Sequence, residues 1–147
     1  MTREGLDEQR LAHRVLAHSP DNISVVGPDH RYRYVNAHYT VDYGLSAEDI
    51  VGKAVVELIG QSAYDKHARR LLDRCLAGES VSYHDWLGVD PARRNYKQVS
   101  YTPLRDDDGR GEGVLVMSRI LCDCWVASRL MMVGERAGGV SHEFNNL

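Results

Sequence analysis

The stretch ISVVGPDHRYRYVN, residues 23–36, decides how this chain of 147 residues begins to fold. Residues 23–26 favour extended structure, residues 27–30 are rich in turn formers, and residues 31–35 alternate between polar and apolar. Two such runs separated by a short turn predict a pair of antiparallel strands. Asn36 follows at once and is a favoured N-cap residue. The stretch therefore predicts a β-hairpin that leads directly into a helix.

Helical patterns lie on both sides of this hairpin. Upstream, residues 5–18 (GLDEQRLAHRVLAH) place apolar side chains near helical spacing. Downstream, we expect one short helix from Asn36 to Tyr43 and another that a capping box starts at Ser46. The strongest helical pattern covers residues 61–77, where one apolar stripe runs to a glycine stop.

Three further strands are predicted at residues 80–89, 95–104 and 113–120. Short turns join neighbouring strands, so all five strands should form one antiparallel sheet with the helices on one face. The fold class is thus α+β, and a helical cover over a curved sheet is a natural place for a small-molecule pocket. We divide the chain into an N-terminal helix (1–20), a globular domain (21–120) and a C-terminal segment (121–147).

The composition excludes several classes of protein. A net charge of −3 gives no basic surface for nucleic acid, and no apolar run is long enough to span a membrane or act as a signal peptide. The three cysteines, Cys75, Cys122 and Cys124, are an odd number, which favours reduced thiols in the cytoplasm. Packing is favoured over a metal or redox role for them, because two neighbouring thiols fill only half a tetrahedral site.

The C-terminal segment carries a heptad pattern. Its apolar residues are spaced alternately by four and three: Val126, Leu130, Val133, Ala137, Val140, Phe144 and Leu147. One helix cannot bury such a stripe alone, so we expect a homodimer through parallel helices of residues 121–147, aided by the globular domain and the N-terminal helix. His142 then lies at the exposed f position and Glu143 at g. A zinc helix would need a second histidine where Asn146 stands, so no metal site is predicted.

The chain resembles two families. Residues 21–120 resemble a PAS domain, in the stretches DHRYRYVN (29–36), LSAEDIVGKAVVELIG (45–60), LLDRCLAGESVSYHDW (71–86) and YKQVSYTPLRDDDGRGEGVLVMSR (96–119). The string GGVSHEFNNL (138–147) resembles the H-box of the dimerisation and phosphoacceptor domain of sensor histidine kinases. The usual Asp-Ile-Thr-type junction is replaced by residues 120–122, Ile-Leu-Cys, and this puts the usual polar latch in doubt.

The resemblance implies roles for the last residues. His142 would be the phosphoacceptor, Glu143 its acid/base partner, and Asn146 would position water for dephosphorylation of a response regulator. The ATP-binding domain of a kinase and the response regulator would be partners, with no nucleic acid and no membrane insertion. No ATP-binding motif is visible in these residues, so we expect no kinase activity from them alone. The alternative is a PAS module for ligand or protein binding whose tail is only a dimerising coiled coil.

The sequence does not identify a ligand for the predicted pocket. We expect no covalently bound chromophore, and neither flavin nor haem is favoured. His67 lies where haem-binding relatives carry their iron ligand, but a solvent-facing or hydrogen-bonded imidazole is the better interpretation. The aromatic residues Tyr34, Tyr83, Trp86 and Tyr101 are expected in the core more than around a ligand.

Overall fold

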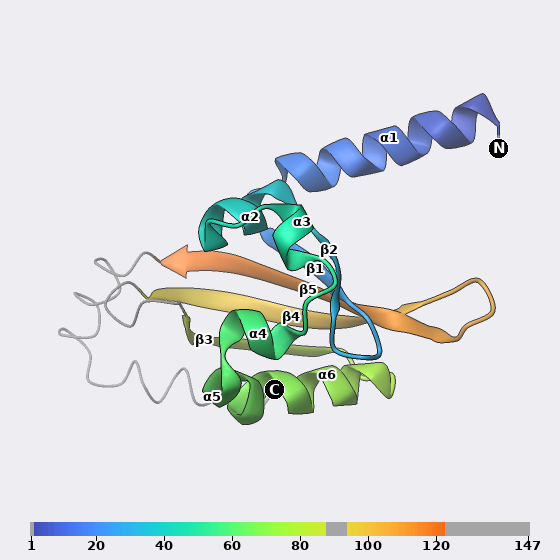
Figure 1. Cartoon of the computed structure of the whole chain (residues 1–147). Helices are drawn as coiled ribbons and strands as arrows, with labels where there is room; N and C mark the ends of the chain where they lie inside the picture. Colours follow the sequence, from blue (N-terminus) through green and yellow to red (C-terminus); the bar gives the residue numbers. More distant parts are fainter. Residues whose placement is uncertain (1, 88–93, 123–147) are drawn as a thin grey trace.

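The computed structural model describes residues 2–87 and 94–122. A five-stranded antiparallel sheet, with strand order β2-β1-β5-β4-β3, forms its centre, and short helices cover one face (Figure 1). The elements are α1 (Arg3–His18), β1 (Asn22–Val26), β2 (Tyr32–Val35), α2 (Ala37–Tyr43), α3 (Ala47–Ile50), α4 (Val55–Ile59), α5 (Gln61–Ala63), the π-helix η1 (Tyr64–Ala68), α6 (Arg69–Leu76), β3 (Val81–Leu87), β4 (Asn95–Arg105) and β5 (Gly111–Cys122).

The predicted N-terminal hairpin is confirmed. Ser24 pairs with Val35 and Val25 with Tyr34 across β1 and β2. The turn closes with a hydrogen bond from the Gly27 N–H to the Arg31 carbonyl. Asn36 caps α2 by accepting from the Tyr39 N–H, as the sequence predicts.

The last strand holds the sheet together. β5 pairs with β1 on one side and with β4 on the other, so it lies at the centre of the sheet although it is last in sequence. The α+β class, the single antiparallel sheet and the helical cover on one face are all confirmed. Strand β5 continues to Cys122, so the predicted start of the C-terminal helix at residue 121 is wrong, and residues 123–147 lie outside the described residues.

The predicted helix 61–77 is wrong in one respect, because it is not a single α-helix. Its middle is the π-helix η1, where the Arg69 N–H donates to the Tyr64 carbonyl five residues earlier. A π-turn inserts one residue into the helical repeat, and such turns are often found at functional sites. Hydrophobic spacing alone does not reveal the insertion. The sequence also missed α4, which starts with the Ala54 N–H bonded to the Glu57 carboxylate.

The core lies between the sheet and α2, α3, α4 and α6. It contains Val26, Tyr32, Val35, Tyr39, Ile50, Val55, Ala68, Leu71, Leu72, Cys75, Val99, Tyr101 and Val114. Full burial of a Val, Leu or Ile side chain is worth roughly 1.5–3 kcal/mol, so this cluster supplies the main stabilisation of the fold. Cys75 is completely buried within it, which confirms the packing role predicted for this thiol. Within the described residues, no helix is long and apolar enough to cross a membrane.

Candidate functional site

Five tyrosines gather in the interior between the sheet and α2. Tyr32 comes from β2, Tyr39 and Tyr43 from α2, Tyr83 from β3 and Tyr101 from β4. Tyr32, Tyr39 and Tyr101 are buried, whereas Tyr43 and Tyr83 are partly buried and pack against the core. Chain segments far apart in sequence therefore bring one type of polar aromatic side chain to one place, which we call the tyrosine cluster.

The rings and hydroxyls of the tyrosine cluster make direct contacts. The hydroxyls of Tyr32 and Tyr39 are hydrogen-bonded at 2.7 Å. Tyr39 and Tyr43 stack with their centroids 4.8 Å apart, and Tyr83 and Tyr101 stack at 6.3 Å. Buried phenols normally keep a hydrogen-bond partner, because an unpaired buried hydroxyl is costly. The cluster is thus an ordered polar group inside an otherwise apolar core.

Burial keeps these phenols neutral. Desolvation raises the pKa of Tyr32, Tyr39, Tyr43 and Tyr101, and it raises the pKa of Tyr83 to about 12. Neighbouring phenols raise the pKa of Tyr39 and Tyr101 further, because two phenolates close together would repel. At neutral pH the cluster can offer hydrogen bonds and aromatic stacking, but no charge. Phenols that stay neutral at this pH are poorly suited to acid–base chemistry.

His67 lies at the edge of the tyrosine cluster. It is partly buried on η1, and its ring stacks on Tyr83 with the planes at 21° and the centroids 6.4 Å apart. The imidazole therefore packs on an aromatic side chain rather than pointing freely into water. Of the other aromatic residues named from the sequence, Tyr101 is buried, and Tyr34, Tyr83 and Trp86 are partly buried. Core placement is thus confirmed for Tyr101.

A second polar group ties the hairpin turn to the helices. His30 lies in the turn with a φ of 58°, a left-handed conformation that is unusual outside glycine. Its Nδ1 is 2.6 Å from the Tyr64 hydroxyl, and its Nε2 is 2.9 Å from the Asp73 carboxylate. Tyr64 begins η1 and Asp73 lies on α6, so one imidazole links three elements.

A third polar group joins the two ends of the domain. Asn36 is 1% exposed. Its side-chain nitrogen donates to the carbonyls of Leu16 and Asp21. Its side-chain oxygen accepts from the N–H groups of Ile23 and Tyr39. The Asp21 carboxylate is bound by two nitrogens of Arg119, at 3.1 and 3.0 Å. We call the three side chains Asn36, Asp21 and Arg119 the corner.

The corner joins the segments that flank the domain on both sides. Arg119 lies on β5, three residues before Cys122, the last described residue. Asn36 holds the last turn of α1 through the Leu16 carbonyl. Both the N-terminal helix and the strand that leads to the C-terminal segment are therefore fixed at this one place.

The predicted phosphoacceptor group cannot be placed in this geometry. His142, Glu143 and Asn146 all lie outside the described residues, as does Cys124. Within residues 2–87 and 94–122 no group of His, Cys, Asp and Glu side chains has the arrangement of a metal site.

Sequence reasoning missed the corner and the His30 group. Asn36 is recognisable as a helix cap, but its other three hydrogen bonds reach residues that no local pattern connects to it. Asp21 and Arg119 are 98 positions apart, so only the sheet register brings them together. For His30, the tight turn is a local signal, but its partners on η1 and α6 are not predictable from spacing.

Comparison with known proteins agrees with this geometry. A family model described as the PAS fold matches residues 16–121. No protein with a curated function matches the chain in sequence.

Several solved structures are similar in fold. The PAS domain of BvgS from Bordetella pertussis has a TM-score of 0.67 and 18% identity, with 89% of this chain and 98% of that chain covered. A sensory box sensor histidine kinase from Vibrio cholerae has a TM-score of 0.60 and 18% identity, with 81% and 94% covered. Vibrio cholerae VqmA, in a complex with ligand and DNA, has a TM-score of 0.65 and 19% identity, with 82% and 52% covered. The chain thus spans about half the length of the VqmA chains that it matches.

Proposed function

The chain belongs to the PAS family, and from this premise we propose that it is the sensory and dimerisation segment of a two-component histidine kinase. In this proposal the PAS domain receives a small-molecule, redox or protein signal. The signal alters phosphorylation of His142, and a response regulator then receives the phosphoryl group.

One observation carries the proposal: the string GGVSHEFNNL forms the last part of a heptad pattern that begins at Val126, shortly after β5. A PAS domain followed by an H-box is the order expected of a cytoplasmic sensor kinase. The fold likeness to a sensory box sensor histidine kinase and to the BvgS PAS domain is consistent with this order.

The proposed chemistry uses three residues. A ring nitrogen of His142 attacks the γ-phosphorus of ATP, and the N–P bond forms as the bond to ADP breaks. Glu143 holds the other ring nitrogen and takes up its proton. Asn146 would orient the water that later removes the phosphoryl group from the response regulator. The ATP-binding domain must approach from outside, and an f position on the helix leaves His142 open to it.

Dimerisation is part of the proposal. Parallel helices built on the heptad pattern of residues 126–147 would pair two copies and place their histidines on the outside of the pair. VqmA, a protein of similar fold, also forms a dimer.

The experiment is phosphorylation with and without His142. This chain, or the longest natural chain that contains it, is incubated with ATP and the ATP-binding domain of a histidine kinase. We expect acid-labile, alkali-stable phosphate on the protein, and none on His142→Gln, which should fold normally because an exposed position costs little to change. Glu143→Gln should slow the transfer. Equal phosphate on the His142→Gln variant would contradict the assignment.

The second candidate is a PAS module that binds a ligand and has no kinase role. The tyrosine cluster favours it, because it offers ordered hydrogen bonds in the interior, and the fold is shared with VqmA in a ligand and DNA complex. The two candidates differ in one result. A protein that binds a small molecule but never gains phosphate on His142 would support the second.

A further inference from the structure

Three side chains, where the hairpin turn meets η1 and α6, have the arrangement of a nucleophile, a base and a residue that orients the base. The Nδ1 atom of His30 is 2.6 Å from the Tyr64 hydroxyl, and its Nε2 atom is 2.9 Å from the Asp73 carboxylate. These distances lie in the range at which a positioned base can take a proton from a hydroxyl. The three side chains therefore meet the geometric requirement for an activated nucleophile.

The chemistry of the partners fixes the direction of both hydrogen bonds. A carboxylate only accepts, so the neutral imidazole of His30 carries its proton on Nε2 and donates it to Asp73. The Nδ1 atom then has a free lone pair, and the Tyr64 hydroxyl donates to it. The phenol proton of Tyr64 thus points at an atom that can accept it.

The backbone holds His30 in this position. Its φ of 58° is a left-handed conformation that a residue other than glycine keeps only where its surroundings impose it. The His30 N–H donates to the Gly27 carbonyl, and the His30 carbonyl accepts from the Val55 N–H. The His30 side chain is only 14% exposed, which limits the other orientations of the ring. The base is therefore preorganised, as a functional side chain needs to be.

Two further features favour attack by the Tyr64 oxygen. The Arg69 guanidinium lies over the Tyr64 ring, 5.1 Å from its centroid, and an ion pair with Asp65 at 2.9 Å fixes its position. A nearby cation favours the negative charge that develops on a phenol as the phenol loses its proton. Tyr64 is only partly buried and the Asp73 side chain is 62% exposed, so the three side chains are open to solvent.

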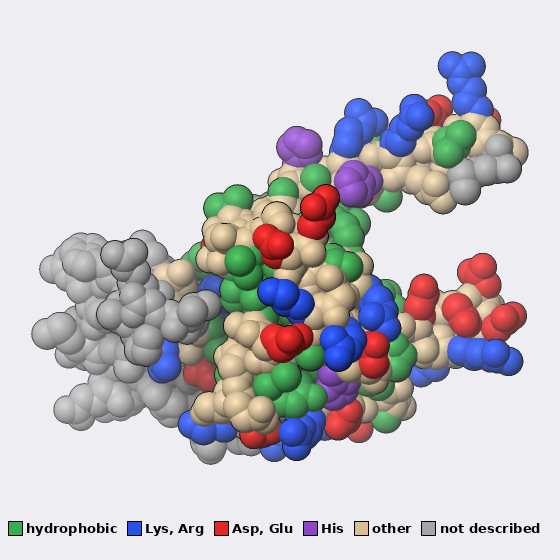
Figure 2. Space-filling model, in the orientation of Figure 1, with side chains coloured by type: hydrophobic (Ala, Val, Ile, Leu, Met, Phe, Trp, Pro, Cys, Tyr) green, Lys and Arg blue, Asp and Glu red, His purple; other side chains and the backbone are tan. Residues whose placement is uncertain are grey.

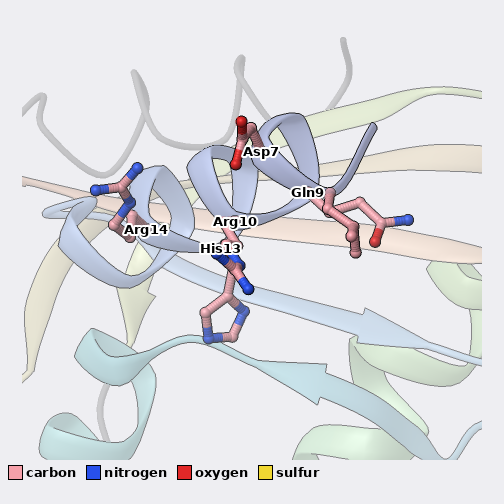
Figure 3. A pocket seen from close by; sticks show the side chains of 6 residues that line it. Asp7, Gln9, Arg10, His13 and Arg14 are labelled. Carbon is pink, nitrogen blue, oxygen red and sulfur yellow. The ribbon is translucent and has the colours of Figure 1, made fainter. Parts of the chain in front are cut away.

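The open hollow along α1 also contains an imidazole, but it lacks this arrangement. The hollow is lined by Leu6, Asp7, Gln9, Arg10, His13 and Arg14. Figure 3 shows Arg10 and His13 together on one side of the helix, with Asp7 pointing another way. The carboxylate of Asp7 therefore does not orient His13, in contrast to the carboxylate of Asp73 beside His30.

We propose that Tyr64 is a nucleophilic tyrosine and a site of covalent acylation by an activated ester, with His30 as its general base and Asp73 as the residue that positions His30. The Tyr64 oxygen attacks the carbonyl carbon of the ester and forms a C–O bond, while the phenol proton passes to Nδ1 of His30. The bond from that carbon to the leaving group breaks, and the leaving group takes the electron pair. Figure 2 shows acidic and basic side chains mixed over α6, so an uncharged ester meets no surface of a single sign.

Acylation of Tyr64 would also change a contact that leads to the interior. An acyl group on the phenol oxygen removes the hydrogen that Nδ1 of His30 accepts, so the hairpin turn loses this contact with η1. His67 lies on the same π-helix and stacks on Tyr83 of the tyrosine cluster. A covalent change at the surface would thereby reach the cluster, and this does not depend on His142 or on the proposed kinase role.

Acetylation by p-nitrophenyl acetate tests the proposal on the unchanged protein. The whole chain is treated briefly at neutral pH together with N-acetyltyrosinamide, which gives the rate of an ordinary phenol, and mass spectrometry of peptides locates the acetyl groups. We expect Tyr64 to be acetylated at least about tenfold faster than N-acetyltyrosinamide, because a positioned base typically accelerates a reaction by about a hundredfold or more. Equal rates, or acetyl on His30 instead of Tyr64, would overturn the proposal.

Variants separate the reactivity from a purely structural role. His30→Asn removes the base but suits the left-handed turn, because asparagine adopts this conformation more readily than most residues. It should slow acetylation of Tyr64 at least about tenfold. The rate at Tyr34, which is also partly buried, is the matched control and should not change. An unchanged rate at Tyr64 in a folded His30→Asn protein, as judged by circular dichroism, would overturn the assignment of the base.

The positioning role of Asp73 has its own test. Asp73→Asn should slow acetylation of Tyr64 about three- to tenfold, because Nε2 of His30 loses its carboxylate partner. Asp73→Glu keeps a carboxylate and should hold the rate within about threefold of that of the unchanged protein. A rate as low in Asp73→Glu as in Asp73→Asn would show that the charge is not what matters and would overturn this role.

Discussion

Replacement of Asn36 by alanine should destabilise the protein far more than loss of an ordinary helix cap. The Asn36 side chain is 1% exposed and makes four hydrogen bonds to the backbone of α1, the α1–β1 connection, β1 and α2. Alanine removes all four and brings no polar group to replace them.

The magnitude follows from the groups left behind. Loss of the cap on the Tyr39 N–H costs about 1 kcal/mol. The Ile23 N–H becomes a buried donor without a partner, at about 1–3 kcal/mol. The Leu16 carbonyl still accepts from Ser19, so it contributes little. With a smaller contribution from the Asp21 carbonyl, we expect Asn36→Ala to lower the free energy of unfolding by about 2–4 kcal/mol.

The assay is urea unfolding followed by circular dichroism, with Ser46→Ala as the matched control. Ser46 caps α3 at an exposed position, so its loss should cost only about 0.5–1 kcal/mol. Asn36→Ser keeps a capping oxygen and should fall between the two. If Asn36→Ala costs no more than Ser46→Ala, the corner is not the structural centre that its hydrogen bonds indicate, and the reasoning is refuted.

Three further results are expected. Tyr39→Phe should lower the free energy of unfolding by about 1–2 kcal/mol, measured in urea, because it removes a buried hydroxyl from its partner on β2. The free energy of unfolding should fall as the pH rises from about 10 to 12, because Tyr83 keeps its proton to about pH 12 in the folded protein but loses it near pH 10 in the unfolded chain. Absorbance at 295 nm follows the ionisation of tyrosine, and urea midpoints follow the stability. A stability that does not change over this pH range would contradict the prediction. In a variant with the other two cysteines replaced by serine, Cys75 should react with a thiol reagent at pH 8 only after the protein unfolds, because burial raises the pKa of Cys75 to about 11. Rapid reaction of the folded protein would show that the thiol is accessible.

Much of the fold was predictable because its signals are local. The hairpin turn, the Asn36 cap and the end of the next helix at Tyr43 each depend on a few residues, and all three appear where the sequence places them. The alternation of polar and apolar residues determines which face of each strand packs against the helices. The short connections between neighbouring strands predict that the strands pair in one antiparallel sheet. The internal π-turn at Tyr64–Ala68 has no such signal, since it changes the phase of a helix without changing its composition.

The candidate site was less predictable because its contacts are long-range. Tyr83 and Tyr101 are recognisable as aromatic residues of strands, but their position near Tyr43 depends on how α2 packs on the sheet. The pairing of Asp21 with Arg119 depends on β5 entering the sheet beside β1. Residues 142–146 are the reverse case, where a local string suggests a role and the described residues provide no geometry to test it.

The hydrogen bonds place the tyrosine cluster, α1 and the end of β5 in one continuous chain of contacts. Tyr39 touches the cluster through its hydroxyl and the corner through its N–H, which donates to Asn36. The Asn36 amide holds both the last turn of α1 and the Asp21 carbonyl, and the Asp21 carboxylate holds Arg119 on β5. The Asp21 side chain is 9% exposed whereas that of Arg119 is 64% exposed, so the guanidinium reaches a buried carboxylate from the surface. If a change in the packing of the tyrosine cluster moves α2, Asn36 must move with it, because the Asn36 side-chain oxygen accepts a hydrogen bond from the Tyr39 N–H on α2. That movement reaches α1 and β5 together, and under the proposed function these are the two elements through which two copies would respond as one.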